Sequence, residues 1–345
     1  MNASYALRQS QQLWSKRSAA STWQLVGARV TNNADNRILS SLIIVKGFSS
    51  NAADPPPAAA AMHNNPASSS SSVSQEEVSK FSGMHKEWWD PEFHPLIAMN
   101  PVRIGYILDH LPRAQQQHTS GSLPSSPLPL EGLKALDVGC GGGLLSESLA
   151  RLGADVTAID PSRALVDMAA NHAQQTGDPR LSKIHYRQLT VEELAADPAH
   201  VGHYDMVCLL EVLEHVTNVE SMLRAASLLV KKPTTTTHDN RDGGRLFVST
   251  MNRTLKSHLI TIVGAEYIMG YVPKGTHNWD QYLTPEEVGG IMNACQMNQQ
   301  DVSGMVLASP PFCGNWDWKI DSSDLDVNWI GVYSPKADSF VKEGG

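Results

Sequence analysis

ALDVGCGGGLLSESLARLGADVTAID, residues 135–160, contains an apolar run, a glycine-rich turn, an amphipathic run and a second apolar run. An apolar run that leads into glycines and then into a helical pattern is typical of a strand–turn–helix unit, and a second strand completes a βαβ unit. We therefore predict strands at 135–139 and 155–160, with a helix at 144–152 between them.

The same alternation continues toward the C-terminus. Further strands are predicted at 183–187, 204–210 and 245–250, and further helices at 162–175 and 219–230. Alternation of this kind indicates an α/β fold with a mostly parallel sheet and helices on both faces. Two later apolar runs, at 302–307 and 326–334, predict an antiparallel closing pair.

Charge is distributed unevenly along the 345 residues, whose net charge is −8. Residues 1–50 contain six basic residues and one acidic residue, so the other 295 residues carry −13. A basic, serine-rich and acid-poor segment predicts a mitochondrial transit peptide, with a chloroplast address or an ordinary tail as alternatives. Residues 51–75, rich in Ala, Pro and Ser, predict a disordered linker. The acidic remainder argues against a nucleic-acid binder.

Composition also limits the domain organisation. We expect one domain over residues 76–335 and a tail at 336–345. The N-terminal part of the domain (76–111) is predicted to be a helical cap, with helices at 76–89 and 102–111. Four cysteines without a CxxC pair argue against a zinc ribbon or a disulfide framework. The sequence contains no apolar run of the eighteen or more residues that a membrane span needs.

The glycine turn begins at Gly139 and is followed by Asp160 at the end of the second predicted strand. An acid at that position can accept hydrogen bonds from both ribose hydroxyls of a nucleoside. The dinucleotide fingerprint G-x-G-x-x-G would require glycine at position 144, where the chain has Leu144. The pattern therefore favours S-adenosylmethionine (SAM) over NAD, and a structural turn without a ligand is the third possibility.

A second acidic motif follows the strand at 204–210. If the chain is helical there, Glu211, Glu214 and His215 share one face. Two carboxylates and an imidazole can hold a divalent ion. Two alternatives stay open: His215 as a general base on a phenol, and a turn that only braces the strand. Leu210, just before the motif, is expected to touch the cofactor through its backbone or to belong to the core.

Four stretches resemble the ubiquinone-biosynthesis O-methyltransferases of bacteria and mitochondria. They are WWDPEFHPLIAMNPVRIGYI (88–107), the glycine-turn unit (135–160), YDMVCLLEVLEHV (204–216) and the stretch from Ser249 to Val288. The first and the last are not general features of SAM-binding folds, so the resemblance is specific.

The resemblance implies a class I SAM-dependent methyltransferase fold, which is Rossmann-like with an antiparallel closing strand. It implies cofactor contacts at four positions: Arg103, Gly139, Asp160 and Leu210. Arg103 would pair with the carboxylate of the cofactor, which a guanidinium suits geometrically. Mitochondrial members use magnesium at the acidic motif, which implies Mg²⁺ ligands at Glu211, Glu214 and His215.

The resemblance further implies methyl transfer to ring hydroxyls of a polyprenyl-dihydroxybenzoate and of demethylubiquinol. Such an enzyme is expected at the matrix side of the inner mitochondrial membrane, as a peripheral protein in contact with other ubiquinone-biosynthesis proteins. The apolar segment 255–273, interrupted by Glu266, suits an interfacial segment, with a buried helix as the alternative. Competing functions are a non-catalytic SAM-fold scaffold, another phenol methyltransferase and an NAD-dependent oxidoreductase.

Overall fold

The structure is a computed structural model that describes residues 72–83, 88–89, 95–111, 128–233, 243–261, 278–308 and 316–336. The predicted transit peptide, most of the predicted linker and the predicted tail beyond residue 336 lie outside these ranges. Ser72 is the first described residue and lies just before the predicted domain start; its carbonyl accepts a hydrogen bond from the backbone N–H of Thr217 (2.8 Å).

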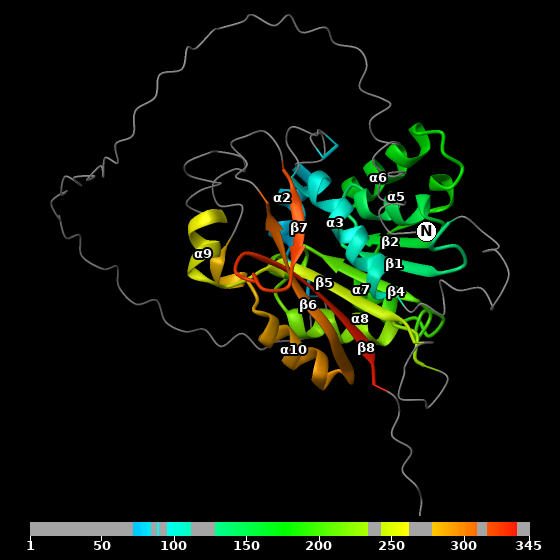
Figure 1. The fold of residues 1–345 in the computed structure, drawn as a ribbon. Helices are drawn as coiled ribbons and strands as arrows, with labels where there is room; N and C mark the ends of the chain where they lie inside the picture. The colour runs from blue at the N-terminus through cyan, green and yellow to red at the C-terminus, as the bar shows by residue number, and fades with distance from the viewer. Residues whose placement is uncertain are drawn as a thin grey trace, which may run out of the picture. The chain divides into compact units, whose positions relative to one another are not determined.

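One eight-stranded sheet forms the centre of the described fold, in the order β3-β2-β1-β4-β5-β8-β6-β7 (Figure 1). The strands are β1 (Lys134–Val138), β2 (Asp155–Asp160), β3 (His185–Gln188), β4 (Met206–Leu210), β5 (Arg245–Met251), β6 (Met297–Leu307), β7 (Trp318–Asp321) and β8 (Asn328–Pro335). Strands β1 to β5 pair in parallel, whereas β8 is antiparallel to both β5 and β6. The predicted α/β class and its antiparallel closing pair are confirmed.

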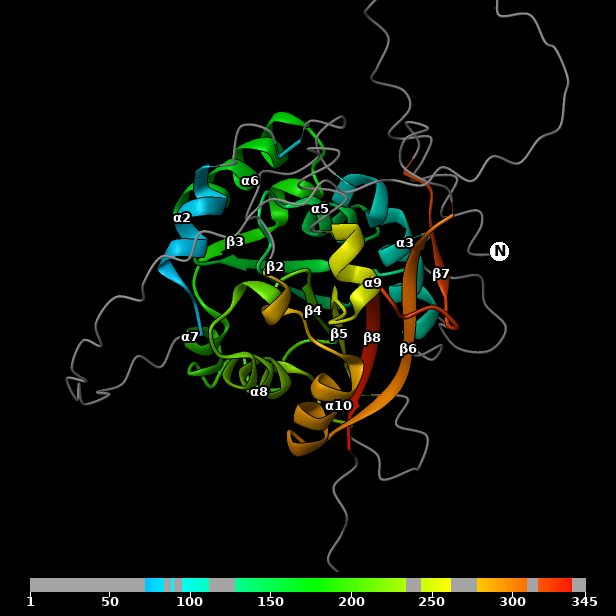
Figure 2. The ribbon, with the colours of Figure 1, turned by 90° about the vertical axis from the view of Figure 1, so that its left-hand side faces the viewer.

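Helices cover both faces of this sheet (Figure 2). They are α2 (Gln75–Gly83), α3 (Pro95–His110), α5 (Leu144–Arg151), α6 (Arg163–Gln175), α7 (Val191–Ala195), α8 (Val219–Leu229), α9 (Leu255–Ser257) and α10 (Pro285–Ala294). Figure 2 shows α5 and α6 on one side of the sheet and α7, α8 and α10 on the other. Among the residues described, no helix is long and apolar enough to cross a membrane.

Two apolar layers, one on each face of the sheet, make the core. The first contains Ile107 of α3 and Leu149 of α5, and the second contains Leu223 of α8 and Met292 of α10, all essentially inaccessible to solvent. Strand β5 is buried along its whole length, as expected for a strand whose two faces are both covered. The layers fix the carboxyl ends of the parallel strands at one edge.

Several elements differ from the sequence predictions. Helix α3 begins at Pro95, seven residues before the predicted start, and it tolerates Pro101 in its interior. Helix α2 ends at Gly83, whereas the predicted helix continued to residue 89. Helix α10 was not predicted, although Thr284 forms a capping box with Glu287 and Pro285 follows it, a recognisable start signal.

Candidate active site

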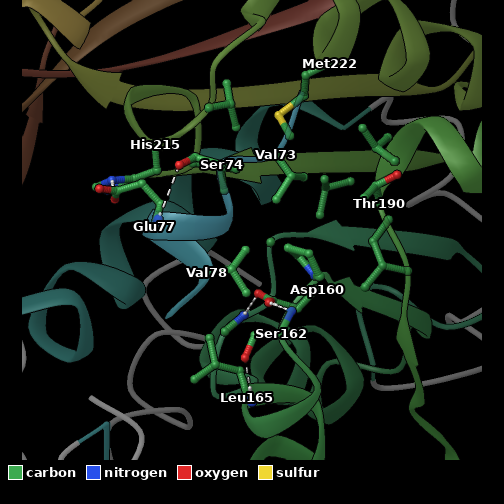
Figure 3. A pocket seen from close by; sticks show the side chains of 18 of the residues that line it. Val73, Ser74, Glu77, Val78, Asp160, Ser162, Leu165, Thr190, His215 and Met222 are labelled. Carbon is green, nitrogen blue, oxygen red and sulfur yellow. Dashed lines mark hydrogen bonds and ion pairs between the residues drawn. The ribbon is translucent and has the colours of Figure 1, made fainter. Parts of the chain in front are cut away.

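A pocket of about 740 Å³, part of it open to solvent, lies at the carboxyl ends of β1, β2 and β4 (Figure 3). Its lining includes Gly139 of the glycine turn, Asp160 at the end of β2, and Glu211 and His215 after β4. Open α/β sheets bind their ligands at this edge. The topology thus brings both predicted motifs to one cavity, although they are about 50 residues apart in sequence.

The glycine turn requires glycine for two physical reasons. Gly139 (φ +70°) and Gly143 (φ +87°) have left-handed backbone conformations that other residues adopt only with strain. A Cβ on Gly139 would also lie 2.7 Å from Cγ2 of Val212, and one on Gly143 would lie 2.6 Å from the hydroxyl of Tyr186. The chain's own side chains therefore approach these glycines closely, in addition to any ligand.

Asp160 is held by the backbone around it. Its Oδ2 accepts a hydrogen bond from the Gly141 N–H (3.0 Å), and its Oδ1 accepts one from the Ser162 N–H (2.8 Å), as Figure 3 shows. Burial raises the pKa of this carboxyl. A carboxylate oxygen can accept two hydrogen bonds, so each oxygen retains capacity for one more. Asp160 therefore fits a ligand with two adjacent hydroxyls.

A second acid, Asp137, lies beneath the turn. Its Oδ2 accepts a 2.5 Å hydrogen bond from the Ser146 hydroxyl, which joins the end of β1 to the start of α5. Burial raises the pKa of Asp137 to about 6, and the nearby negative charge of Asp160 adds to the shift. Asp137 supports the turn from below rather than lining the cavity.

Glu211 has an unusual backbone, with φ of +58°. This left-handed conformation is strained for a residue with a Cβ, and such strain concentrates at functional sites. Its Oε1 accepts a hydrogen bond from the Ser249 hydroxyl (2.7 Å) and lies 3.0 Å from Nη2 of Arg103. Donors from β5 and α3 therefore surround this carboxylate.

Glu214 and His215 point to other partners. The buried Glu214 accepts a hydrogen bond from the Thr250 hydroxyl (2.7 Å), and both burial and the negative charge of Glu211 raise its pKa. Nδ1 of His215 lies 2.9 Å from Oε2 of Glu77 on α2 (Figure 3). That hydrogen bond lowers the pKa of Glu77.

The predicted helical face at this motif is wrong. Leu213–His215 forms a single 3₁₀ turn, η3, and the left-handed Glu211 precedes it, so the spacing of an α-helix does not apply. No group of three His, Cys, Asp or Glu side chains in the described ranges is arranged to hold a metal ion. As arranged here, Glu211, Glu214 and His215 do not fit a magnesium site, because each carboxylate or imidazole is directed to a different protein partner.

Arg103 is buried in α3, with 4% of its surface exposed. Its guanidinium forms an ion pair with Glu211, but its Nε–H has no hydrogen-bond acceptor among the described residues. An unpaired buried donor is costly, and a guanidinium pairs well with a carboxylate. The donor fits the carboxylate of an amino-acid ligand. Leu210, the last residue of β4, is partly buried and packs against the first core layer.

Helix α2 contributes to the pocket in a way that sequence reasoning missed. Val73 pairs with Val216 in an isolated antiparallel bridge, and the hydroxyls of Ser82 and Ser162 lie 2.7 Å apart. Glu77 also lines the cavity (Figure 3). The segment 72–83 therefore covers the pocket from η3 to the start of α6. No local sequence signal indicates this, because the contacts join segments 80 or more residues apart.

The predicted interfacial segment is only partly described. Residues 262–273 lie outside the described ranges. In the part that is described, Leu255, Leu259 and Ile260 are 73%, 53% and 45% exposed. Three exposed apolar side chains within six residues form an apolar surface at α9.

Comparisons with known proteins give a consistent set of relatives. Residues 136–233 match a family described as "Methyltransferase domain". A ubiquinone biosynthesis O-methyltransferase from Azorhizobium caulinodans is 42% identical over 265 residues, which are 76% of this chain and 94% of that protein. One from Marinobacter nauticus is 41% identical over 235 residues, 68% and 86% of the two chains. Among solved structures, a SAM-dependent methyltransferase from Thermotoga maritima, described as a possible histamine N-methyltransferase, is 14% identical, with a TM-score of 0.49 and coverage of 76% and 99%.

Proposed function

This chain belongs to the ubiquinone biosynthesis O-methyltransferases, and from that membership we propose that it methylates ring hydroxyls of a polyprenyl-dihydroxybenzoate and of demethylubiquinol. The chain is a methyltransferase with SAM as the methyl donor. The matches cover 94% and 86% of the length of the two relatives.

One observation carries the proposal: a single pocket joins Asp160 and Gly139 to the acidic motif. Asp160 would accept hydrogen bonds from the ribose hydroxyls of the methyl donor. Arg103 would pair with its carboxylate through the buried Nε donor. When bound, SAM supplies an electrophilic methyl carbon on a sulfonium. The backbone of Leu210, at the end of β4, is proposed as a further contact.

His215 is the proposed general base for the ring hydroxyl. Its Nδ1 is 2.9 Å from the Glu77 carboxylate, and a carboxylate in that position orients the imidazole of a histidine base. Glu77 belongs to the segment that covers the pocket, so closure and orientation of the base are coupled. Alignment of the hydroxyl and exclusion of water then supply much of the rate acceleration.

Magnesium at Glu211, Glu214 and His215 is a separate proposal that rests on the family resemblance. It requires these side chains to leave the partners that they have here, Ser249, Thr250 and Glu77, and no step of the mechanism depends on it. In its favour, Glu211 and Glu214 are close enough for the charge of one to raise the pKa of the other. A chelator should then abolish methyl transfer and added Mg²⁺ should restore it. Full activity in the presence of the chelator rejects the requirement.

The experiment for the main proposal is a mass-spectrometric assay of methyl transfer to a short-tailed prenylated 3,4-dihydroxybenzoate. We expect a product heavier by one methyl group with the wild type and none with His215→Ala. Asp178→Asn is a matched control, because Asp178 pairs with Arg180 away from the pocket. Binding of SAM without methylation of any ring hydroxyl would favour the scaffold alternative, and methylation only of unprenylated phenols would favour a different methyltransferase.

Peripheral membrane contact is proposed for the apolar surface at α9. The exposed side chains of Leu255, Leu259 and Ile260 support it. In liposome flotation, replacing all three with serine should abolish association. The matched control is Val201→Ser with Leu228→Ser, two apolar residues that are 48% and 51% exposed elsewhere on the fold. Unchanged flotation of the triple variant rejects this contact.

We also propose mitochondrial targeting by residues 1–50, a linker at 51–75 and a catalytic domain at 76–335, with the tail at 336–345. The basic, acid-poor composition of residues 1–50 supports mitochondrial targeting. Fusion of residues 1–75 to a fluorescent protein should give protease-protected import into isolated mitochondria, and a fusion with the basic residues replaced should not. In mitochondria, the chain is proposed to act at the matrix side with other ubiquinone-biosynthesis proteins, which co-fractionation would test.

A further inference from the structure

Trp88 lies directly against the glycine turn. A Cβ on Gly142 would stand 2.6 Å from Cγ of Trp88, and one on Gly141 would stand 2.8 Å from its Cη2. Side chains do not pack this closely, so the indole occupies the surface that the two glycines leave open. Trp88 also lines the pocket beside Asp160. The same ring therefore contacts the turn and borders the cavity.

The neighbouring Trp89 anchors this arrangement. Its Nε1 donates a hydrogen bond to the Gly142 carbonyl (3.1 Å), and its ring stacks on His172 with centroids 3.7 Å apart and planes 8° from parallel. Nδ1 of His172 lies 2.6 Å from Oε1 of Glu147. Glu147 is fully buried, and its other oxygen accepts a hydrogen bond from Arg151 (2.7 Å).

This set of contacts fixes the tryptophan pair from two helices. Glu147 is in the first turn of α5, which begins at the glycine turn, and His172 is in α6, which follows Asp160. The stacked ring, the hydrogen bond to Gly142 and the buried carboxylate together restrict Trp89 to one position. Trp88, bonded to it, is thereby oriented before any ligand arrives, and preorganisation of this kind lowers the cost of binding.

We propose that Trp88 is a cofactor-contacting residue whose indole forms a wall of the methyl-donor pocket, and that Trp89 and His172 are positioning residues for it. The inference rests on the proposed use of SAM. The face of an indole is large, apolar and attractive to cations. A sulfonium carries a positive charge, whereas the demethylated product, S-adenosylhomocysteine, carries none at sulfur. The wall is therefore expected to favour the donor over the product.

The test measures binding by the full-length chain, without a methyl acceptor. By calorimetry, Trp88→Leu should weaken SAM binding about 3- to 30-fold, and Trp88→Phe should restore most of the loss. Trp318→Leu is the control, because Trp318 belongs to β7 at the far edge of the sheet. The chain has eight tryptophans, so the emission change on binding is compared between variants, and Trp88→Phe should remove most of it.

The outcomes separate the two levels of the argument. If the wild type binds no SAM, the proposed function fails. If the wild type binds and Trp88→Leu binds equally well, the role of Trp88 fails while the proposed function stands. A loss for SAM alone would locate the ring at the charged sulfur and support both the contact and the preference for the donor. An equal loss for SAM and S-adenosylhomocysteine would support the contact and overturn the preference for the donor.

The positioning role has its own readout. His172→Ala removes the stacking on Trp89 and the bond to Glu147, whereas His172→Phe retains the stacking. We expect His172→Ala to lower the affinity for SAM about threefold or more at a temperature well below unfolding, and His172→Phe to recover part of it. A variant that unfolds at lower temperature but binds SAM as the wild type does would overturn the positioning role.

Discussion

On the glycine-turn side of the pocket, Asp160 and Asp137 accept hydrogen bonds from groups no more than 19 residues away in sequence. On the other side, Glu211 and Glu214 accept them from residues 36 or more positions away, on β5 and β8. Both sides carry one acid that lines the cavity and one buried acid paired with a hydroxyl. The two sides therefore have the same kinds of acids, but the hydrogen-bond donors come from nearby residues on the first side and from distant residues on the second.

The difference separates two ways to build an acidic site. The glycine-turn side is local, because one βαβ unit contains the acids and their partners. The Glu211 side depends on tertiary structure: Arg103 comes from α3 and its charge is available only when α3 packs on the sheet. Removal of Asp160, the acid of the first side that lines the cavity, should therefore act mainly on binding, whereas removal of Arg103 on the second side should lower stability in addition to any effect on binding.

The largest effect is expected from removal of the Arg103 charge. In Arg103→Met the Glu211 carboxylate, with 11% of its side chain exposed, loses its cation. Breaking a buried pair from one side costs about 3 to 5 kcal/mol of unfolding free energy. Urea denaturation of the two proteins measures the loss.

The control for that prediction is the double variant Arg103→Met with Glu211→Gln, in which no charge is left without a partner. It should recover at least 1 kcal/mol relative to Arg103→Met, as a positive coupling between neighbours requires. If Arg103→Met loses less than about 1 kcal/mol of unfolding free energy, solvent rather than α3 compensates the charge of Glu211. The proposed difference between the two sides would then be wrong.

On the local side, Asp160→Asn should act on binding more than on folding. The amide of asparagine has one acceptor oxygen and cannot accept hydrogen bonds from both ribose hydroxyls as a carboxylate does. The affinity for SAM should therefore fall about 100-fold, which is about 3 kcal/mol of binding free energy. Calorimetry measures the affinity. Ser162→Ala is the matched control, because it keeps the backbone N–H that donates to Asp160. Equal affinity in Asp160→Asn and the wild type would remove Asp160 from the ligand contacts.

The same division explains how much could be predicted from the sequence. Strands β1, β2 and β4, and the place of Asp160 at a strand end, follow from local periodicity and were predicted within two residues. The left-handed backbone of Glu211 depends on its contacts with β5 and α3. Because of it, Glu211, Glu214 and His215 do not share one helical face as predicted. The cover formed by α2 and the fit of Trp88 on the glycine turn join distant segments, which no single-segment pattern encodes.

The buried acid on the local side predicts a pH dependence. The pKa of Asp137 is about 6 in the fold against an ordinary 3.8, so the folded state binds the proton more tightly than the unfolded state. Stability therefore falls as pH rises from about 4 to about 6, by no more than about 3 kcal/mol. Asp137→Asn, which can still accept a hydrogen bond from Ser146, should make this fall smaller in urea titrations at several pH values. The remaining fall belongs to Asp160 and Glu214, whose pKa values are raised by burial as well.

A control of opposite sign is available at Asp178. Its hydrogen bond with Arg180 lowers its pKa, so the stability it contributes is present at neutral pH and is lost as pH falls. In Asp178→Asn, the unfolding free energy should therefore decrease less as pH is lowered toward the acid range. The fall in unfolding free energy between pH 4 and 6 should remain. If Asp137→Asn leaves that fall unchanged, the hydroxyl of Ser146 keeps the acid ionised throughout.

The smallest effect is expected where both sides meet, at the bond between Glu77 of α2 and His215 of η3. Both side chains are about one-fifth exposed, so Glu77→Gln should cost at most about 1 kcal/mol. Global stability should hardly change, but amide hydrogens in 75–83 should exchange about two- to fivefold faster, because the cover opens locally. Glu76→Gln is the matched control: the same charge is lost from an exposed position one residue earlier. Equal exchange in the two variants would show that Val73 and Ser82 alone hold α2 over the pocket, and faster exchange in Glu77→Gln alone would tie closure of the pocket to the proposed base.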